Sequence, residues 1–430
     1  MTFLFLVIYV TILFLRPQEW YAPLAGYELV NVAAILTIFA TFISQLRKGD
    51  PLRGLMRNRF ARLMFGLLAA VALSQLTRFR FRGALDAFTD FGKMVVLFTL
   101  TMILVDNPQR SKKMMWVVVL SAALLSVSAI LQATRGFGFG NVTPFGSFES
   151  GDFRVQGTGI FGDPNDFAML YLMATPFVFS LLQSKVNFLA KGFLLCLLPA
   201  FLYTLYYTQS RGAVIGFCAS LLAYLWIGRR VSFVRLLFTA MLLTVAVAFG
   251  PARARETVYE GSAAGRITQW GVGNWYLMQN PLFGIGYSRW GDFEATAPHN
   301  SFVQCYAELG LVGYFFWFGL SLVVLRTLQR VIKLQSQLGA DVVTLARGSF
   351  ASLVGFLTSA FFLTHAYHPP LYFLLAMGVG LVIFAQRQPN VPPNALAITA
   401  RDLRWCAIWE LLSIPTIWLI ARAYWAGAGG

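Results

Sequence analysis

A histidine followed by an asparagine is the clearest chemical feature of this sequence. His299 and Asn300 stand in Pro-His-Asn-Ser, between a Gly/Pro-rich segment at 280–286 and a long apolar run. Histidine is the side chain best suited to move protons near neutral pH, so His299 is a candidate general base. The same four residues also resemble a helix start, in which Asn300 or Ser301 merely caps the first turn. Both interpretations stay open at this point.

Arginine is the second residue type that suggests chemistry. Arg154, Arg211, Arg266 and Arg289 lie in or beside the segments between apolar runs, together with Arg135 and an Arg-Phe-Arg-Phe-Arg stretch at 78–82. A guanidinium presents a planar fork of donors that matches a phosphate, so converging arginines would bind an anion. Pairing with local acids is the alternative, and Asp163, Asp166, Asp292 and Glu294 are among those available.

The elements that must position these residues are membrane helices. The chain of 430 residues is 57% hydrophobic and only 12% charged, with a mean hydropathy of +0.64, whereas a typical soluble domain is about 25% charged. Apolar runs long enough to cross a bilayer recur along its length. We therefore predict an all-α, polytopic transmembrane helical bundle of about twelve spans. The first run lacks the charged start of a signal peptide, so we expect an uncleaved helix. The spans are expected near 1–15, 29–46, 60–77, 91–105, 114–132, 166–183, 189–207, 212–227, 231–249, 301–325, 348–365 and 371–385.

The distribution of basic residues predicts the orientation of the bundle. Lys and Arg gather in alternate loops, around 47–59, 110–113, 185–191, 229–235 and 326–347, and such loops are usually cytoplasmic. The segments 16–28, 78–90, 133–165, 208–211, 250–300 and 366–370 are then extracytoplasmic. Much of the net charge of +16 is explained by this topology, so no nucleic-acid partner is expected. The four cysteines form no C-x-x-C pair and predict neither a disulfide framework nor a metal knuckle.

Two outer loops carry most of the polar residues. In 133–165, the run Asp163-Pro-Asn165-Asp166 reads as a cap on the following span. In 250–300, between spans nine and ten, a short helix is expected at about 263–279, with Arg266, Trp270 and Asn274 on one face. This stripe could line a cleft; for Trp270 and Trp275 a position at the membrane interface is the preferred interpretation.

The chain is expected to divide into a membrane domain and a C-terminal appendage. The domain covers 1–385, a polar linker on the cytoplasmic side covers 386–404, and 405–425 forms either an interfacial helix or a thirteenth span.

The order of several short motifs resembles the O-antigen ligase and polysaccharide polymerase superfamily of bacterial membrane glycosyltransferases. These motifs are Gly-Asp-Pro-Asn-Asp-Phe-Ala at 162–168, Ser210-Arg211-Gly212, Arg266 with Trp270, Asn-Pro-Leu-Phe-Gly-Ile-Gly at 280–286, and Pro298-His299-Asn300 followed by Glu308-Leu-Gly310. The layout is similar over roughly 30–385, but the motifs themselves fall in 154–313. Phe302-Val303 departs from the pattern, in which many members carry Leu.

The resemblance implies the transfer of a glycan from a polyprenyl diphosphate carrier to an acceptor hydroxyl at the periplasmic face of the bacterial inner membrane. It implies that His299 acts on the acceptor and that Arg211 and Arg266 bind the diphosphate. Arg154 and Arg289 are further donor-binding candidates, and Asn300, Glu308, Asp163, Asn165, Trp270, His365 and His368 are supporting candidates. The acceptor is a lipid core, a glycan or a protein.

Three other interpretations remain. A polymerase would use the same chemistry on a growing glycan. A transporter of an anionic substrate would use the arginines as its binding site, although no inverted repeat is evident in the sequence. The third interpretation is a metal site formed by His299, His365 and His368, but no acidic or cysteine ligand accompanies them in the sequence. We expect no metal and no cofactor.

Overall fold

The computed structural model describes residues 1–46, 51–227 and 256–428. Its first half contains α1 (Thr2–Leu15), α2 (Pro17–Trp20), η1 (Ala22–Leu24), α3 (Leu29–Leu46), α4 (Pro51–Arg57), α5 (Arg59–Leu76), α6 (Phe81–Leu104), α7 (Pro108–Arg135), η2 (Phe139–Asn141), β1 (Phe145–Ser147), β2 (Asp152–Arg154), η3 (Gly159–Phe161), α8 (Pro164–Gln183), α9 (Phe188–Thr208) and α10 (Arg211–Trp226). Its second half contains α12 (Glu256–Gln279), α13 (Trp290–Phe293), α14 (Ser301–Lys333), α15 (Gln335–Leu338), α16 (Ala340–Ala360), α17 (Pro369–Gln386) and α18 (Ala400–Ala428).

Long apolar helices confirm the predicted all-α, multi-pass membrane architecture. Within the described residues, 11 helices are long and apolar enough to cross a membrane, and α10 is a shorter apolar helix of 16 residues. The predicted spans coincide with these helices to within a few residues at most of their ends. The expected ninth span at 231–249, with its neighbours Arg229, Arg230, Arg235, Arg253 and Arg255, lies outside the described residues.

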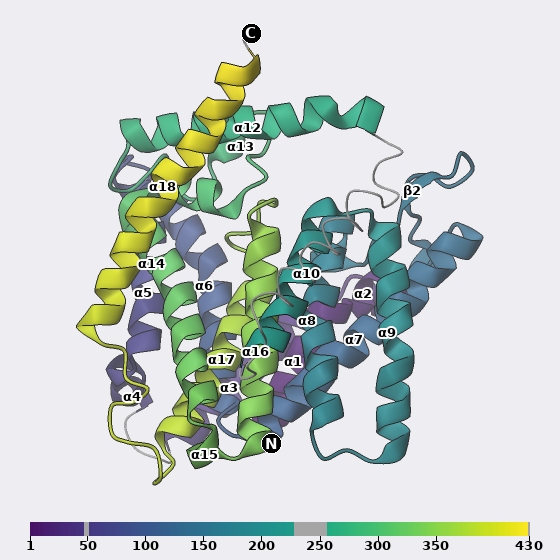
Figure 1. Ribbon diagram of the computed structural model, residues 1–430, viewed down its shortest axis with the longest axis vertical. Coiled ribbons are helices and arrows are strands. Elements are labelled where there is room, and N and C mark those ends of the chain that lie inside the picture. Colours follow the sequence, from purple (N-terminus) through teal and green to yellow (C-terminus); the bar gives the residue numbers. More distant parts are fainter. Residues whose placement is uncertain (47–50, 228–255, 429–430) are drawn as a thin grey trace.

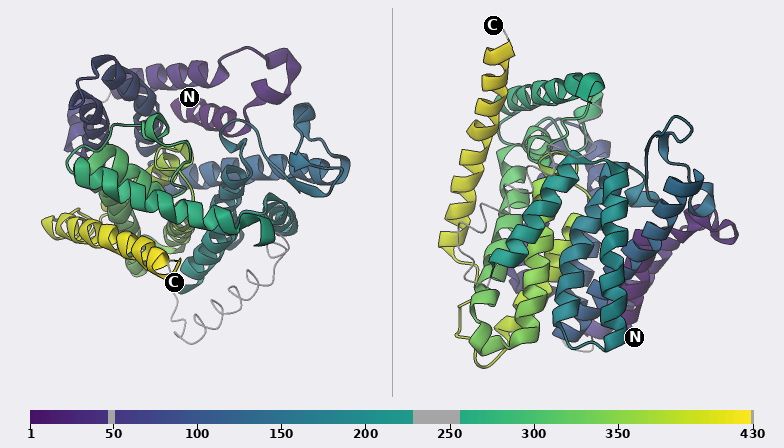
Figure 2. Two further views of the ribbon diagram at one scale, coloured as in Figure 1. Left: turned by 90° about the horizontal axis from the view of Figure 1, so that it is seen from above. Right: turned by 45° about the vertical axis from the view of Figure 1, so that its right-hand side comes forward.

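The segments predicted to be extracytoplasmic meet at one end of the bundle. Glu19 accepts a hydrogen bond from the backbone N–H of Gly159, Arg78 donates to the carbonyl of Gly284, and His368 contacts the carbonyl of Ile160. Helix α12 lies across this end, nearly at right angles to the bundle helices (Figures 1 and 2). We call it the α12 end.

The basic residues around 59 and 326–330 lie at the opposite end, where the polar linker packs on them. Arg59 donates to the carbonyl of Ile398, and Arg330 donates to the carbonyl of Ala397 and to the carboxylate of Asp402. The two sets of loops that the charge count separated are therefore also separated in the structure.

Several predicted boundaries are wrong. The segment 78–90 was expected to be a loop, but α6 begins at Phe81 and makes most of it helical. The charged residues of this segment are compatible with a helix because they lie on exposed faces of its first turns. Helix α16 covers 340–360 rather than 348–365, and α18 begins at Ala400, five residues before the predicted start. The helix expected at about 263–279 begins at Glu256. A small antiparallel hairpin of β1 and β2, not predicted, lies inside the loop at 133–165.

Helix α14 is broken at Gly310, whose backbone (φ 63°, ψ −168°) is accessible to glycine alone. The segment at 281–286 fills the break: Leu311 N and Val312 N donate to the carbonyls of Pro281 and Leu282, and Ile285 N donates to that of Ala307. A Cβ on Gly310 would lie 2.4 Å from the carbonyl oxygen of Leu282. The motif at 280–286 and the glycine after Glu308 thus form one backbone joint, which fixes α12 and its loop to α14.

Small residues bring α10 against α16. A Cβ on Gly216 would lie 2.7 Å from the carbonyl oxygen of Gly355, and a Cβ on Gly212 would lie 2.8 Å from the Cβ of Phe362. Close approach through small residues is a usual way to pack membrane helices. It places Arg211, the first residue of α10, beside the turn that follows α16.

Candidate active site

His299 lies at the α12 end, immediately before α14, and its backbone is held in an unusual conformation. Its φ is 45°, in the left-handed region that a histidine seldom adopts. The backbone N–H of His299 donates to Thr364 Oγ1 at 3.0 Å. Two residues later, Ser301 Oγ donates to the carbonyl of Leu363 and accepts from the N–H of His365. These hydrogen bonds connect the start of α14 to the turn at 363–365 and thereby set the position of His299.

The surroundings of His299 favour its neutral ring. Burial is the largest effect that lowers its pKa below the ordinary value, and the positive charge of Arg266 lowers it further. His365 acts in the same direction, whereas the negative charge of Asp163 opposes them. A neutral imidazole at physiological pH has a free nitrogen lone pair and can accept a proton.

Arg266 and Arg211 lie within electrostatic reach of each other. Burial lowers the pKa of Arg266 from its usual range, and the charge of Arg211 lowers it further. The Nε of Arg266 is buried and has no hydrogen-bond partner among the described residues. Two neighbouring guanidinium groups repel each other, and a bound anion would relieve that repulsion. Their arrangement suits a phosphate or diphosphate.

His365 forms a pair with Asp166 on another side of the site. Its Nε2 lies 2.6 Å from Asp166 Oδ1, and its Nδ1 lies 2.8 Å from the carbonyl oxygen of Thr364. Its ring stacks on that of His368, with 4.8 Å between centroids. Burial lowers the pKa of His368 to about 3, so this ring is neutral.

Asp166 was not singled out as a site residue from the sequence. Its position in the first turn of α8, after a Pro-Asn pair, read as part of a helix cap. Among the residues that the structure describes, no three His, Cys, Asp or Glu side chains are placed to hold a metal ion.

Most of the predicted supporting residues have structural partners near this site. Asp163 caps α8 by accepting from the N–H of Asn165, as predicted, and Asn300 caps α14 by accepting from Phe302 N and Val303 N. The Nε of Arg154 donates to the carbonyl of Thr208, and its Nη2 donates to Asn165 Oδ1. Arg154 thus links the loop at 133–165 to the ends of α8 and α9.

Glu308 is buried next to the site and holds the loop that follows the segment 281–286. Its Oε1 accepts from the N–H of Trp290 at 2.9 Å, and its backbone carbonyl accepts from Gly286 N. It is 1% exposed. Glu308 therefore supports the loop that precedes His299.

The prediction that Trp270 rests at the membrane interface is wrong. Trp270 is buried, donates from Nε1 to the carbonyl of Pro298 at 3.0 Å and packs edge-on against Phe361. On the same face of α12, Asn274 accepts from the hydroxyl of Tyr306. Arg266, Trp270 and Asn274 share this face because they recur every four residues. The hydrogen bonds of Trp270 and Asn274 turn it toward Pro298 and α14. Trp275, on another face, is 56% exposed.

Arg289 belongs to a different cluster of charges. Its Nε lies 2.9 Å from Asp292 Oδ2, its Nη1 donates to the carbonyl of Ile285, and its guanidinium lies over the ring of Phe293. Arg80 lies 3.3 Å from the same carboxylate. We call Arg80, Arg289 and Asp292 the Arg289 cluster. Local pairing, the alternative considered for the outer arginines, accounts for its geometry.

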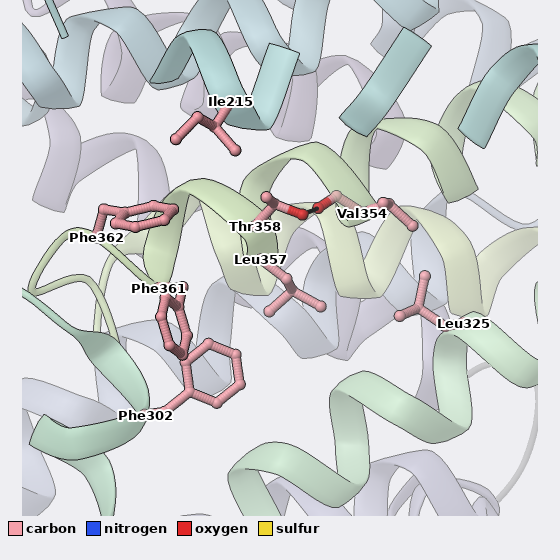
Figure 3. A pocket seen from close by; sticks show the side chains of 8 residues that line it. All are labelled: Ile215, Phe302, Leu325, Val354, Leu357, Thr358, Phe361 and Phe362. Carbon is pink, nitrogen blue, oxygen red and sulfur yellow. Dashed lines mark hydrogen bonds between the residues drawn. The ribbon is translucent and has the colours of Figure 1, made fainter. Parts of the chain in front are cut away.

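An apolar groove lies next to the site. It has a volume of about 460 Å³ and lies between α10 and helices α14 and α16. In Figure 3, Ile215 faces Leu357 and Thr358 across it, with Phe302, Phe361 and Phe362 at one end and Leu325 and Val354 at the other. The hydroxyl of Thr358 is hydrogen-bonded to the carbonyl of Val354, so the lining presents hydrocarbon. Phe302 follows His299 by three residues, and Phe361 packs on Trp270, so this end of the groove lies near the site.

Comparison with protein families supports the resemblance seen in the sequence. The family model described as O-antigen ligase matches residues 194–318. A search among curated proteins found no match. The matched region contains Arg211, Arg266, the joint at Gly310 and His299. An O-antigen ligase-like or polymerase-like function follows from this match, whereas Asp166, His365 and His368 lie outside it.

Proposed function

We propose that the protein is a glycosyltransferase that moves a glycan from a polyprenyl diphosphate carrier to an acceptor hydroxyl. The observation that carries this proposal is the placement of a neutral His299 beside the Arg211–Arg266 pair, at the head of an apolar groove. A lipid-linked diphosphate donor needs all three features: a base for the acceptor, positive charge for the leaving group and hydrocarbon for the lipid.

In this mechanism, His299 accepts the proton of the acceptor hydroxyl as its oxygen attacks the anomeric carbon. The bond between that carbon and the phosphate oxygen breaks, and its electron pair leaves with the polyprenyl diphosphate. Direct attack of this kind inverts the anomeric configuration. Arg211 and Arg266 stabilise the charge that develops on the diphosphate. Since these guanidinium groups supply positive charge at the leaving group, the reaction does not require a divalent ion.

We assign the groove between α10 and α14/α16 to the polyprenyl tail. A tail lying there would place its diphosphate beside Arg211, which starts α10, and Arg266, which lies on α12. We assign the remaining motif residues to support: Arg154, Asp163 and Asn165 shape the start of α8, and Asn300 and Glu308 hold His299 and its loop. His365, with Asp166, orients the turn at 363–365, and His368 packs against it. Arg289, a donor-binding candidate from the sequence, is assigned to stabilising its own loop.

We further propose that the α12 end faces the periplasm of a bacterial inner membrane and that α18 is the thirteenth span. Helix α18 begins beside Arg330 at the opposite end and reaches α12. Between these ends, the thiol of Cys406 and the hydroxyl of Ser413 are hydrogen-bonded to α14. Its 29 residues extend for about 44 Å, more than the roughly 30 Å of a hydrocarbon core. An interfacial helix would instead lie along one face of the bundle.

The break in α14 does not favour a transporter. Broken membrane helices in transporters leave backbone groups to coordinate the substrate, whereas here the segment at 281–286 bonds the groups exposed at Gly310. A polymerase shares the proposed chemistry and differs in its acceptor.

Reconstitution tests the proposal and separates ligase from polymerase. Purified protein in liposomes would receive lipid-linked glycan extracted from the host, with lipid A core, a second lipid-linked glycan or periplasmic protein as acceptor. We expect one acceptor to gain glycan with release of polyprenyl diphosphate. Absence of transfer to every acceptor by the wild type, with all donor intact, would contradict a glycosyltransferase.

A further inference from the structure

A second pocket lies at the α12 end, between α12 and α18. It has a volume of about 220 Å³. Helix α12 contributes Asn274, Trp275 and Met278, and α18 contributes Trp418, Arg422 and Trp425. Figures 1 and 2 show the last turns of α18 passing α12 on the outside of the bundle. The pocket is therefore separate from the groove beside His299.

One polar group of this pocket lacks a partner. Asn274 is 6% exposed, and its Oδ1 accepts from the hydroxyl of Tyr306 at 2.8 Å. Its Nδ2 is buried and has no hydrogen-bond partner among the described residues. A buried donor left without a partner costs roughly 1–3 kcal/mol. An acceptor atom on a ligand in the pocket would remove that cost.

The rest of the lining combines aromatic faces with a cation. Trp275 and Trp425 are 56% and 52% exposed, and the guanidinium of Arg422 lies 5.0 Å from the ring centroid of Trp418. Indole rings offer large flat apolar faces at little conformational cost, while Asn274 and Arg422 supply donors. A sugar ring matches this combination, because it presents C–H groups on its faces and hydroxyl oxygens on its edges. Exposed tryptophans also mark membrane interfaces, but an interfacial belt alone leaves the amide of Asn274 unexplained.

Asn274, which borders the pocket, belongs to the same stripe of α12 as Arg266 of the proposed diphosphate site. Arg266 and Asn274 are eight residues apart on α12, which corresponds to about 12 Å along the helix axis. A short oligosaccharide bridges such a distance. A glycan attached to a diphosphate at Arg266 and extending along α12 would reach the pocket with one of its later sugars.

We propose that the pocket between α12 and α18 is a subsite for the glycan of the lipid-linked donor, binding sugars beyond the one that reacts. This inference rests on the proposed function, because it takes the donor to be a lipid-linked glycan. It gives α18 a role in holding the donor, and it makes affinity depend on glycan length.

Site-specific photo-crosslinking tests the proposal. A benzophenone amino acid would replace Met278, which is 75% exposed at the pocket, in the His299→Asn background so that the donor is not consumed. The same label at Leu419, which is 57% exposed on α18 but does not line the pocket, is the matched control. Ile215 in the apolar groove provides a third position. Cells would be fed a radioactive sugar precursor that labels the glycan. A second host, called the blocked host, would lack the enzyme that transfers the first sugar phosphate to the lipid carrier, so it makes no lipid-linked glycan.

We expect radioactive adducts at Met278 and Ile215, none at Leu419, and none anywhere in the blocked host. Adducts at Ile215 without any at Met278 would overturn the subsite alone and leave the donor groove in place. Adducts at Met278 that persist in the blocked host would also overturn it, since the sugar would then come from elsewhere. No adduct at either position would contradict the lipid-linked donor, and with it both proposals.

Kinetics provide a second readout. Trp418→Ala and Arg422→Ala should each raise KM for a donor with many repeats about three- to tenfold. We expect kcat to stay unchanged, because the lost contacts bind the donor equally in the ground state and in the transition state. With a donor that carries a single sugar, both variants should match the wild type, and Leu419→Ala should match it with either donor. An equal rise in KM for both donors would overturn the subsite.

Discussion

Two clusters of charge at the α12 end differ in how their arginines are satisfied. In the Arg289 cluster, Arg80 and Arg289 share the carboxylate of Asp292. In the cluster around His299, Arg266 is near another arginine and its buried Nε has no partner among the described residues. In the first cluster, the protein itself supplies the carboxylate that pairs with both arginines. We propose that a bound anion completes the second.

This difference teaches that an arginine at the α12 end is not by itself a binding residue. Arg266 and Arg289 lie in the same predicted loop, and charge counts treat them alike. What separates them is the acid three residues after Arg289 and the burial of Arg266 against the bundle. We therefore expect substitutions in the His299 cluster to affect transfer, and those in the Arg289 cluster to affect stability only slightly.

The largest effect is expected at His299. Asparagine tolerates the left-handed backbone of this position better than most residues, so His299→Asn preserves the fold while removing the base. We predict that transfer by the purified variant falls about 10²–10⁴-fold, with an unchanged melting temperature in detergent. Wild-type activity in His299→Asn would show that the residue only starts a helix, and would direct the search for a base to His365.

Arg266 comes next. Arg266→Gln should lower kcat/KM about 10²-fold or more, because a preorganised cation at the leaving group is lost. Arg266→Lys should recover part of that loss, since an ammonium group carries the charge but not the bidentate fork. Arg289→Gln is the matched control and should stay near the wild type. Similar losses in Arg266→Gln and Arg289→Gln would erase the distinction between the clusters.

The pH dependence of transfer sharpens the comparison further. Because burial and Arg266 lower the pKa of His299, its neutral form persists below the ordinary value of about 6.5, and kcat/KM should fall only as the pH drops through that lowered pKa. Arg266→Gln removes one lowering influence, so the acid limb should move to higher pH. Asp163→Asn removes the influence that raises the pKa and still caps α8, so the limb should move to lower pH. Profiles that coincide for all three proteins would exclude His299 as the titrating group.

The smallest effect is expected in the Arg289 cluster. The hydrogen bond from Arg289 holds the pKa of Asp292 below its usual range. A lowered carboxyl pKa contributes stability above the unfolded value of about 3.9, and this contribution is lost as the pH falls through the folded pKa. Asp292→Asn should thus cost on the order of 1 kcal/mol or less at pH 7 and nothing at strongly acidic pH. Thermal unfolding in detergent at both pH values measures this, and a loss of transfer activity in Asp292→Asn would contradict a purely structural role.

Patterns local in the sequence predicted much of the fold. Long apolar runs predicted the helices, and basic residues sorted the loops, because both signals follow directly from the bilayer. Caps such as Asp163 and Asn300 were readable because they act on the next few residues.

Contacts between distant segments were not readable in the same way. The joint between 281–286 and Gly310 and the pair of Asp166 with His365 each depend on which helices pack together. Glycines in both halves of the joint were visible in the sequence, but nothing local told which backbone each would approach. Trp270 was placed at the interface because a tryptophan near a membrane usually is, whereas its partner, the carbonyl of Pro298, is set by the docking of α12.

The most direct test of the central claim is the affinity for the donor itself. The dissociation constant of lipid-linked glycan would be measured for wild type, Arg266→Gln and Arg289→Gln in nanodiscs, all in the His299→Asn background so that no transfer occurs. Loss of a charge-assisted contact of about 1.5–3 kcal/mol predicts roughly 10- to 100-fold weaker binding for Arg266→Gln, and binding within about twofold of the wild type for Arg289→Gln. Equal affinities for the Arg266→Gln and Arg289→Gln proteins would contradict the account.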